Sequence, residues 1–301
     1  MSPATTDPHP PDLRDLNEAA EAIAGPLDAL AAARRAVSSA GNDDGGDPGA
    51  HADADLLVRH LANYLAAVDV AARRGCTNLV DVGAGTGAFS VWAARRLGAD
   101  LRVVEPDPGA RAVSAQAFPA VPLHAATSEL GAGTAGAVTS MEVVEHLVHD
   151  EQPAFVADLA SLVAPGGILA LSTPDESGYP GGWSGYPPHI GPLDYDGLRD
   201  VVTSATGGWP VRVWRLDGPL FRLGWRARLV EPVLNRVWGA AQRSAPALSR
   251  SIAAQTARLA AGLRRGDDGY VLEAARLGPV VAEQRRDGPG TGLLAVAERP
   301  R

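Results

Sequence analysis

The chain has 301 residues, of which 46% are hydrophobic and 21% are charged, and its formal net charge is −8. These fractions are ordinary for a globular protein, and the length suffices for one enlarged α/β domain or two small ones. All 27 basic residues are arginine, which excludes a Schiff-base lysine and the lysine of a P-loop. Pyridoxal-phosphate enzymes and Walker-A nucleotidases are therefore excluded.

The chain contains a single cysteine, Cys76, so it cannot form an internal disulfide. The first residues are polar and rich in proline and lack the apolar core of a signal peptide. No apolar run approaches the ~20 residues that a membrane span requires. We therefore expect a cytoplasmic protein without a membrane partner.

The first fifty residues differ in composition from the rest. Leucine, isoleucine and alanine have helical spacing over residues 12–38, and residues 40–50 are rich in glycine and aspartate. We expect a partly disordered, partly helical extension over residues 1–50, followed by one domain over residues 51–301. Apolar spacing predicts a helix over residues 53–74.

Short apolar runs then alternate with helical patterns. Strands are predicted over residues 78–82, 100–107, 121–126, 136–141 and 168–174, and helices over 89–98, 108–118 and 152–167. This alternation is typical of a parallel sheet covered on both faces. A helix from Asp196 and strands over 211–216 and 292–299 complete a Rossmann-like, seven-stranded, mostly parallel sheet with helices on both faces.

A glycine-rich turn, within NLVDVGAGTGAFS at residues 78–90, joins the first strand to a helix. Its GAGTGA core is one form of the dinucleotide-binding fingerprint, which alone is weak and also fits a tight turn without a ligand. Asp81 can point into the cleft, where it would repel a pyrophosphate but meet a hydroxyl or a positive charge. Glu105 ends the next strand, where a carboxylate can accept both hydroxyls of a ribose.

Four segments in this order resemble the motifs of class I S-adenosylmethionine-dependent methyltransferases, over roughly residues 75–215. They are DVGAGTG at residues 81–87, Glu105, EVVEHL at 142–147 and APGGILALSTP at 164–174. The resemblance implies S-adenosylmethionine as the cofactor. The cofactor-binding residues that it implies are Asp81, Gly83, Ala84, Gly85, Gly87, Glu105, Pro106, Ala126, Thr127 and Met141.

One position departs from the pattern of this family. Many members carry an aspartate after the third strand that holds the adenine amine, whereas this chain has Ala126 and Thr127 there. The adenine contacts would then come from the backbone and Thr127.

Candidate catalytic residues follow the fourth strand. Glu142, Glu145 and His146 are spaced i, i+3 and i+4, so in a helix that starts near Glu142 they share one face. In many members of the family this segment faces the acceptor, and His189 can approach from the opposite side. In a first interpretation, His146 or His189 is a general base for an acceptor hydroxyl, with Glu142 as a third catalytic candidate.

In a second interpretation, Glu142, Glu145, His146 and His189 bind Mg²⁺ or another divalent cation that acidifies vicinal hydroxyls. Glu-x-x-Glu-His also occurs in ubiquinone-pathway O-methyltransferases and small-RNA 3′-terminal ribose methyltransferases, where the resemblance implies a metal. In a third interpretation, His146 only supports a loop and Glu145 is solvated.

A loop rich in glycine and proline follows the fifth strand and carries Tyr179, Trp183, Tyr186 and Tyr195. The pattern indicates either a mobile lid that stacks a planar or sugar-like acceptor, or a surface loop that packs its own aromatic residues.

The charge is distributed unevenly. Residues 212–265 contain eleven arginines against Asp217 and Glu231, a net charge of +9, so the rest of the chain carries −17. A helical insertion is expected over about 219–265. It is either an amphipathic cover or homodimer element, or it binds an anion on a small substrate, a carrier protein or RNA. Because the chain is acidic overall, we do not favour nucleic acid as a partner.

The sequence thus predicts an S-adenosylmethionine-dependent methyltransferase that acts on a hydroxyl of a small-molecule acceptor, either a specialised metabolite or a sugar-like compound. This acceptor can be anionic or carrier-linked. The alternatives are a metal-assisted RNA ribose methyltransferase, a non-catalytic protein that binds the cofactor, and an NAD-dependent oxidoreductase.

Overall fold

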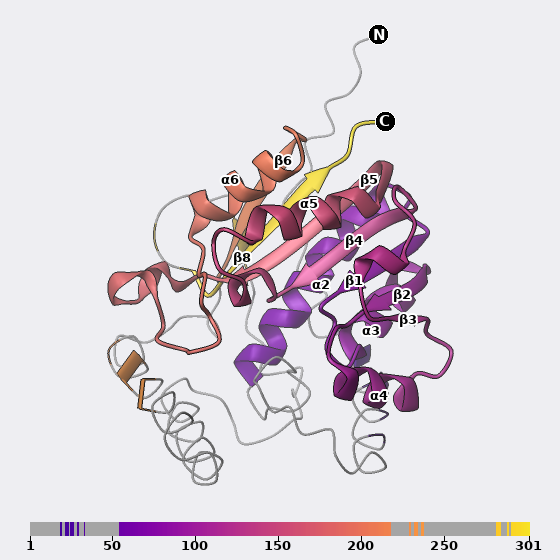
Figure 1. Cartoon of the computed structure of the whole chain (residues 1–301), viewed down its shortest axis with the longest axis horizontal. Helices are drawn as coiled ribbons and strands as arrows, with labels where there is room; N and C mark the ends of the chain where they lie inside the picture. The colour runs from indigo at the N-terminus through magenta and orange to yellow at the C-terminus, as the bar shows by residue number, and fades with distance from the viewer. Residues whose placement is uncertain are drawn as a thin grey trace.

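The computed structural model describes residues 54–217 and 290–301, the strand at 281–283, residue 288, and single residues within 19–33 and 229–237. Its centre is an eight-stranded sheet with the order β3-β2-β1-β4-β5-β8-β6-β7 (Figure 1). The strands are β1 (Asn78–Val82), β2 (Asp100–Val104), β3 (Leu123–His124), β4 (Ala135–Met141), β5 (Val163–Pro174), β6 (Val211–Asp217), β7 (Val281–Glu283) and β8 (Gly292–Glu298).

The sheet confirms the Rossmann-like prediction. Strands β1 to β5 pair in parallel, and β8 lies antiparallel between β5 and β6. One strand of the sheet, β7, was not predicted. It is three residues long and extends the edge by pairing antiparallel with β6.

Helices cover both faces because successive strand residues point to opposite sides and both sides are apolar. Leu79 packs in the core under α2 and α3, whereas Val80 packs in the core under α5 and α6 (Figure 1). The helices are α2 (Ala54–Arg73), α3 (Ala88–Leu97), α4 (Pro108–Ala117), α5 (Gln152–Leu162) and α6 (Tyr195–Ala205).

Three predicted boundaries are wrong. Residues 163–167 belong to β5 rather than to the preceding helix, because Val163 is fully buried and pairs with Ala135 of β4. The third strand is only two residues long. The segment after β4 forms a short 3₁₀ turn, η3 (Val144–His146), instead of a helix that starts near Glu142.

The predicted extents of the domains stay predictions. Most of residues 1–50 and of the insertion at about 219–265 lies outside the described residues, and those described within 229–237 are helical. Ala19 and Ile23 are buried in the same core as α2. Within the described part of the chain, no helix has the length and apolar character to cross a membrane.

Candidate active site

The candidate site lies at the carboxyl ends of the parallel strands. In the sheet, β1 lies between β2 and β4, so the chain leaves β1 toward one side and later returns on the other. In open α/β sheets, ligands bind in the crevice at this switch point. The glycine turn after β1, Glu105 after β2 and Glu142 after β4 all lie at this edge.

The glycine turn is tight and tolerates no side chain at its first position. Gly83 has φ of 74°, and a Cβ there would lie 2.5 Å from Cγ2 of Val143. Gly87 has φ of 81° and precedes α3 without a side-chain cap. The backbone of the turn is therefore fixed by the fold itself, and the first turn of α3 has no side chain capping it.

Glu105 joins the turn to the end of β2. Its Oε2 accepts a hydrogen bond from the Gly85 N–H at 2.8 Å, and its Oε1 accepts one from the Asp107 N–H at 2.9 Å. Burial raises the pKa of Glu105, although these backbone hydrogen bonds oppose the shift. Each oxygen keeps a second lone pair. The donor and acceptor pattern thus fits the ribose hydroxyls that the family resemblance assigns to this residue.

Asp81 does not point into the cleft, which corrects the prediction. It is fully buried, and its carboxylate accepts hydrogen bonds from the hydroxyls of Tyr64 at 2.6 Å, Thr139 at 2.6 Å and Ser90. Burial raises the pKa of Asp81, and the three hydroxyls oppose this. The hydroxylated partners of Asp81 are therefore protein side chains, which tie α2, α3 and β4 to the end of β1.

The other predicted cofactor residues follow the same edge. Ala84 and Thr127 are half-buried, Pro106 and Ala126 are exposed, and Met141 is buried in the core at the end of β4. Their contacts with a cofactor stay predictions.

Glu142 is not in the group formed by Glu145, His146 and His189, although its charge still acts on Glu145. It has φ of 59°, and its Oε2 forms an ion pair with Arg59 of α2 at 3.0 Å. Its Oε1 accepts hydrogen bonds from Ser172 Oγ at 2.9 Å and Asn63 Nδ2 at 3.3 Å. Since Glu142 precedes the 3₁₀ turn in a left-handed conformation, it does not share a helical face with Glu145. These contacts tie the end of β4 to α2 and β5, and a catalytic role of Glu142 stays a prediction.

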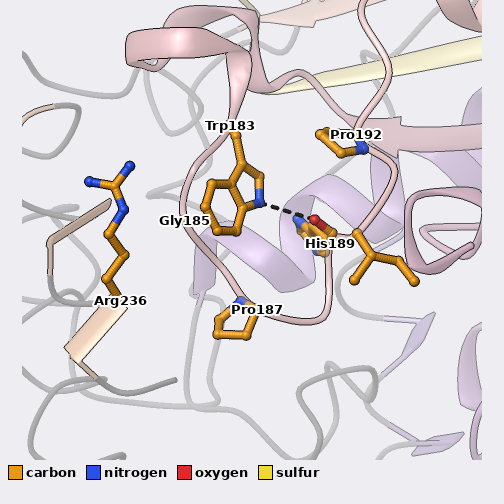
Figure 2. Close-up of a pocket in the computed structure, with 7 residues that line it drawn as sticks. Trp183, Gly185, Pro187, His189, Pro192 and Arg236 are labelled. Carbon is orange, nitrogen blue, oxygen red and sulfur yellow. Dashed lines mark hydrogen bonds between the residues drawn. The ribbon is translucent and has the colours of Figure 1, made fainter. Parts of the chain in front are cut away.

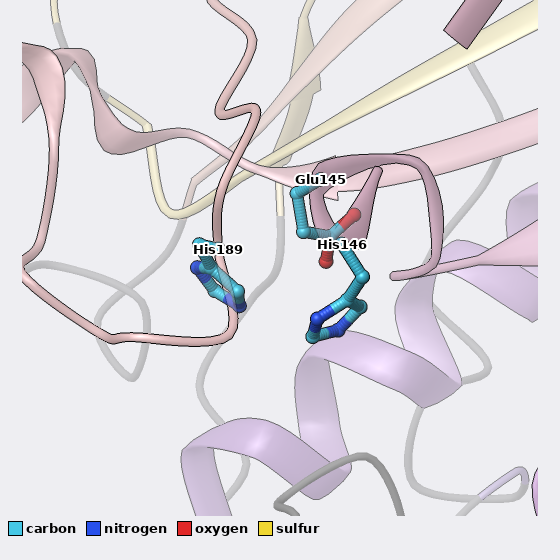
Figure 3. Close-up of side chains that lie close together, drawn as sticks. All are labelled: Glu145, His146 and His189. Atoms are coloured by element: carbon cyan, nitrogen blue, oxygen red, sulfur yellow. The ribbon is translucent and has the colours of Figure 1, made fainter. Parts of the chain in front are cut away.

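Glu145, His146 and His189 form the candidate cluster. Each offers one ligand atom, and these atoms lie within 4.8 Å of one another (Figure 3). Glu145 is 1% exposed, so the interpretation that it is solvated is wrong. Neither carboxylate oxygen makes a hydrogen bond of regular geometry with the described residues, although the nearby Glu145 N–H and Thr173 hydroxyl lower its pKa. Burial, followed by repulsion from Glu142, raises the pKa of Glu145 well above its usual range.

The partners of the two histidines identify the nitrogen that carries the proton in each neutral ring. Nδ1 of His146 lies 3.1 Å from the carbonyl oxygen of Pro188, and Nδ1 of His189 lies 2.5 Å from Oε1 of Glu176. Both partners are acceptors, so each Nδ1 is the donor. In both rings Nε2 then carries the lone pair, which suits a general base or a metal ligand.

Glu176 is a site residue that the sequence reasoning missed. It is 3% exposed, and it also accepts hydrogen bonds from Ser184 N at 2.9 Å and Ser184 Oγ at 2.6 Å. Burial alone would raise the pKa of Glu176, but the hydrogen bond and charge of His189, with the bonds from Ser184, hold it below the usual value. An acid just beyond the carboxyl end of β5 was the only sequence signal for it.

The aromatic loop, which we call the lid loop (residues 175–194), forms a pocket of about 390 Å³ with the described part of 229–237 (Figure 2). Its lining includes Trp183, Pro187, His189, Ile190, Pro192 and Arg236. The pocket lies beside the lid loop and not at the glycine turn, and His189 belongs to both the pocket and the cluster. Tyr195 is not a lid residue, because it begins α6 and packs against the core.

Comparison with protein families gives one match. The model of a family described as a methyltransferase domain matches residues 20–216. No curated protein matches the chain.

Several solved structures are similar over parts of the chain. Phosphoethanolamine N-methyltransferase 2 of Haemonchus contortus is 12% identical with a TM-score of 0.46, over 75% of this chain and 49% of that enzyme. An S-adenosylmethionine-dependent methyltransferase of Archaeoglobus fulgidus is 14% identical with a TM-score of 0.45, over 76% and 93%. An amino pentose methyltransferase of calicheamicin biosynthesis from Micromonospora echinaspora is 36% identical with a TM-score of 0.32, over 35% and 48%. This chain thus spans about half the length of the first of these enzymes.

Proposed function

The chain belongs to a family of methyltransferase domains, and from this premise we propose that it is an S-adenosylmethionine-dependent enzyme that methylates a hydroxyl of a small-molecule acceptor. The observation that supports this acceptor chemistry is the hydrogen bond between Glu176 and His189 at the edge of the cluster. A specialised metabolite or a sugar-like compound fits the size of the lid pocket.

Gly83, Gly85 and Gly87 with Glu105 would hold the cofactor. When bound, it would supply a methyl group on a positively charged sulfur. The acceptor oxygen would bond to the methyl carbon as the carbon–sulfur bond breaks, and S-adenosylhomocysteine would be the leaving group. The protein has to align the acceptor and exclude water. An alcohol is a weak nucleophile until its proton is taken up or shared, so a base at the acceptor oxygen accelerates the transfer.

His189 is the base in this proposal. Its Nδ1–H is donated to Glu176, which leaves Nε2 to accept the proton of the acceptor hydroxyl. Glu176 then stabilises the imidazolium that forms, and it holds the ring in one orientation, as the carboxylate of a catalytic triad does. The cost of burying Glu176 is offset by its hydrogen bonds from Ser184.

A metal-assisted variant of the same reaction is the second candidate, because both carboxylate oxygens of Glu145 are buried and neither makes a hydrogen bond of regular geometry with the described residues. Glu145 with Nε2 of His146 and His189 would bind a divalent cation, which would acidify an acceptor hydroxyl. Two imidazoles and one carboxylate suit Zn²⁺ or Fe²⁺ better than Mg²⁺, which prefers oxygen ligands. Glu142 is not part of this donor set because Arg59 neutralises it.

The acceptor class is tested with methyl-labelled S-adenosylmethionine and cell extract separated into RNA, protein and small-molecule pools. We expect label in the small-molecule pool, and mass spectrometry and NMR of the product would locate the methyl group on oxygen. Label confined to RNA or protein contradicts the proposal. A methyl group on nitrogen or carbon contradicts the oxygen acceptor alone.

The base and the metal are separated by two measurements. If His189 acts as the base, activity survives exhaustive chelation, and calorimetric titration with Zn²⁺ or Mn²⁺ gives no saturable binding. If the metal is required, the wild type binds one ion and loses its activity on chelation. Glu145→Gln then binds no ion.

Glu176→Gln tests the role of the carboxylate. Glutamine can keep the hydrogen bond to Nδ1 but removes the charge that stabilises the imidazolium, so we expect kcat to fall about tenfold to hundredfold. The acid limb of its pH profile should also change. Ser184→Ala is the matched control, because it removes another partner of Glu176 and leaves the pair with His189 intact. Equal effects of both substitutions would indicate that Glu176 only holds the lid loop.

A further inference from the structure

We propose that the lid pocket binds an anionic group of the acceptor and that Arg236 is the residue that recognises it. The inference rests on the proposed function, since it names the chemical class of the acceptor at the same site. That class is a small molecule in which a phosphate, sulfate or carboxylate is attached to an apolar or ring-shaped body carrying the hydroxyl.

Arg236 is held beside the pocket by Trp183. The guanidinium carbon lies 5.9 Å from the centroid of the indole ring, and the indole Nε1–H donates a hydrogen bond to the His189 carbonyl oxygen at 3.0 Å (Figure 2). A guanidinium over an indole is attracted by the ring and keeps the N–H groups at its edge for a ligand. The indole thus orients the cation and does not compete for its donors.

The segment that carries Arg236 is packed against the lid loop. Pro232 is buried, and a Cβ on Gly185 would lie 2.8 Å from the Pro232 carbonyl oxygen. Gly185 has φ of 79°. This close backbone contact places Pro232 directly on the loop, four residues before Arg236, although the two segments are far apart in sequence.

The rest of the pocket complements an anion with an apolar body. Pro187, Ile190 and Pro192 provide apolar surface, and no carboxylate lines the pocket within the part of the chain that the structure describes. Arg236 and His189 lie on opposite sides of Trp183 in Figure 2. A ligand whose anion pairs with Arg236 can therefore lie along the apolar lining and direct its hydroxyl to His189.

The sequence around Arg236 is also strongly positively charged. Residues 212–265 carry a net charge of +9 in a chain whose net charge is −8. A guanidinium binds phosphate and carboxylate through two parallel hydrogen bonds. A pocket of about 390 Å³ has the size of small-molecule sites, which favours a small anion over a polymer as the occupant.

The test separates the unlabelled small-molecule pool by anion exchange and then assays each fraction as acceptor with methyl-labelled S-adenosylmethionine. Four full-length proteins are compared: the wild type, Arg236→Met, Arg236→Lys and Arg199→Met. Arg199 lies on the exposed face of α6 and pairs with Asp196 and Asp200, so Arg199→Met controls for the loss of one positive charge. The affinity for S-adenosylhomocysteine, measured by calorimetry, shows that each variant keeps the cofactor site.

We expect the wild type and Arg199→Met to label compounds retained by the anion exchanger. Arg236→Met should raise KM for these compounds about tenfold to hundredfold with little change in kcat, because a hydrogen-bonded charge pair is lost. Arg236→Lys should recover part of this loss, since it keeps the charge without the planar donors. Alkaline phosphatase treatment distinguishes a phosphate monoester, which loses its retention, from a carboxylate or sulfate.

Label only in the neutral fraction would overturn the anion site and leave the proposed function intact. An unchanged KM in Arg236→Met for a labelled anion would overturn it as well. Label only in RNA or protein would overturn the proposed function and the anion site together.

Discussion

Two buried carboxylates at the same edge of the sheet have opposite surroundings. Asp81 is fully buried and receives three hydroxyl hydrogen bonds. Glu145 is 1% exposed and receives no hydrogen bond of regular geometry from the described residues, with only the nearby Glu145 N–H and Thr173 hydroxyl opposing the effect of burial. Burial raises the pKa of both groups. Because an unsatisfied buried polar group destabilises a fold, the first acid supports the structure, and we infer that the second is kept for a ligand, a metal or a proton.

The largest effect should follow the removal of the satisfied acid. Asp81→Ala leaves the hydroxyls of Tyr64, Ser90 and Thr139 without their shared acceptor, and we expect the free energy of unfolding to fall by about 3–5 kcal/mol. Urea unfolding without cofactor measures this. Unchanged stability with a selective loss of cofactor affinity would show instead that Asp81 serves the ligand.

The second-largest effect should follow a substitution in the glycine turn. Gly83→Ala introduces a left-handed alanine and forces Val143 to move, and we expect the affinity for S-adenosylhomocysteine to fall about thirtyfold or more, or about 2 kcal/mol. The control is Gly98→Ala at the end of α3, where φ is 66° but, beyond its chain neighbours, no described atom lies within 4 Å of the added Cβ. It should lower stability while leaving the affinity unchanged. Equal affinities in the two variants would show that the contact with Val143 does not shape the turn.

Removing the unsatisfied acid should stabilise the protein. Glu145→Gln has no charge to desolvate, so we expect its free energy of unfolding at neutral pH, in chelator, to exceed that of the wild type by about 1–3 kcal/mol. The folded pKa of Glu145 lies above the unfolded one. The contribution of Glu145 to the free energy of unfolding is therefore fully present below its unfolded pKa of about 4.3. It is lost as the pH rises through the folded pKa.

Unfolding curves across this pH range check the sign. The two proteins should converge at low pH and diverge as the pH rises. A wild type that becomes more stable than Glu145→Gln at high pH would mean that the carboxylate has a partner.

The smallest effect should come from removing a single donor to Asp81. Tyr64→Phe leaves Ser90 and Thr139 in place, and we expect a loss of about 1 kcal/mol in the free energy of unfolding. Thermal and urea unfolding measure it. A loss as large as that of Asp81→Ala would mean that Tyr64 supports the site through more than its hydroxyl.

The sequence predicted the strand, turn and helix at residues 78–97 better than the segment after β4, for a physical reason. The strand, glycine turn and helix at residues 78–97 are contiguous, so their apolar spacing and glycines encode them locally. Even there, the direction of Asp81 depended on Tyr64 and Thr139, which come from α2 and β4. Spacing along the chain cannot show such partners.

The acceptor end depends on contacts between distant segments. The helical face predicted for Glu142, Glu145 and His146 failed because Arg59, more than eighty residues earlier, pairs with Glu142, and the chain turns through a left-handed residue. His189 was predicted as a candidate, whereas Glu176 behind it was not. The position of Arg236 beside Trp183 likewise accompanies a contact between distant segments, that of Pro232 with Gly185.

The most direct test of this account compares His189→Ala with the wild type in two measurements on the same samples. One is the affinity for S-adenosylhomocysteine, and the other is the single-turnover rate of methyl transfer to the labelled acceptor. If His189 is the general base, the affinity is unchanged and the rate is about 10²- to 10⁴-fold lower, the range for loss of a general base. A variant that transfers methyl groups at the wild-type rate would contradict the assignment of His189 and the role given to Glu176.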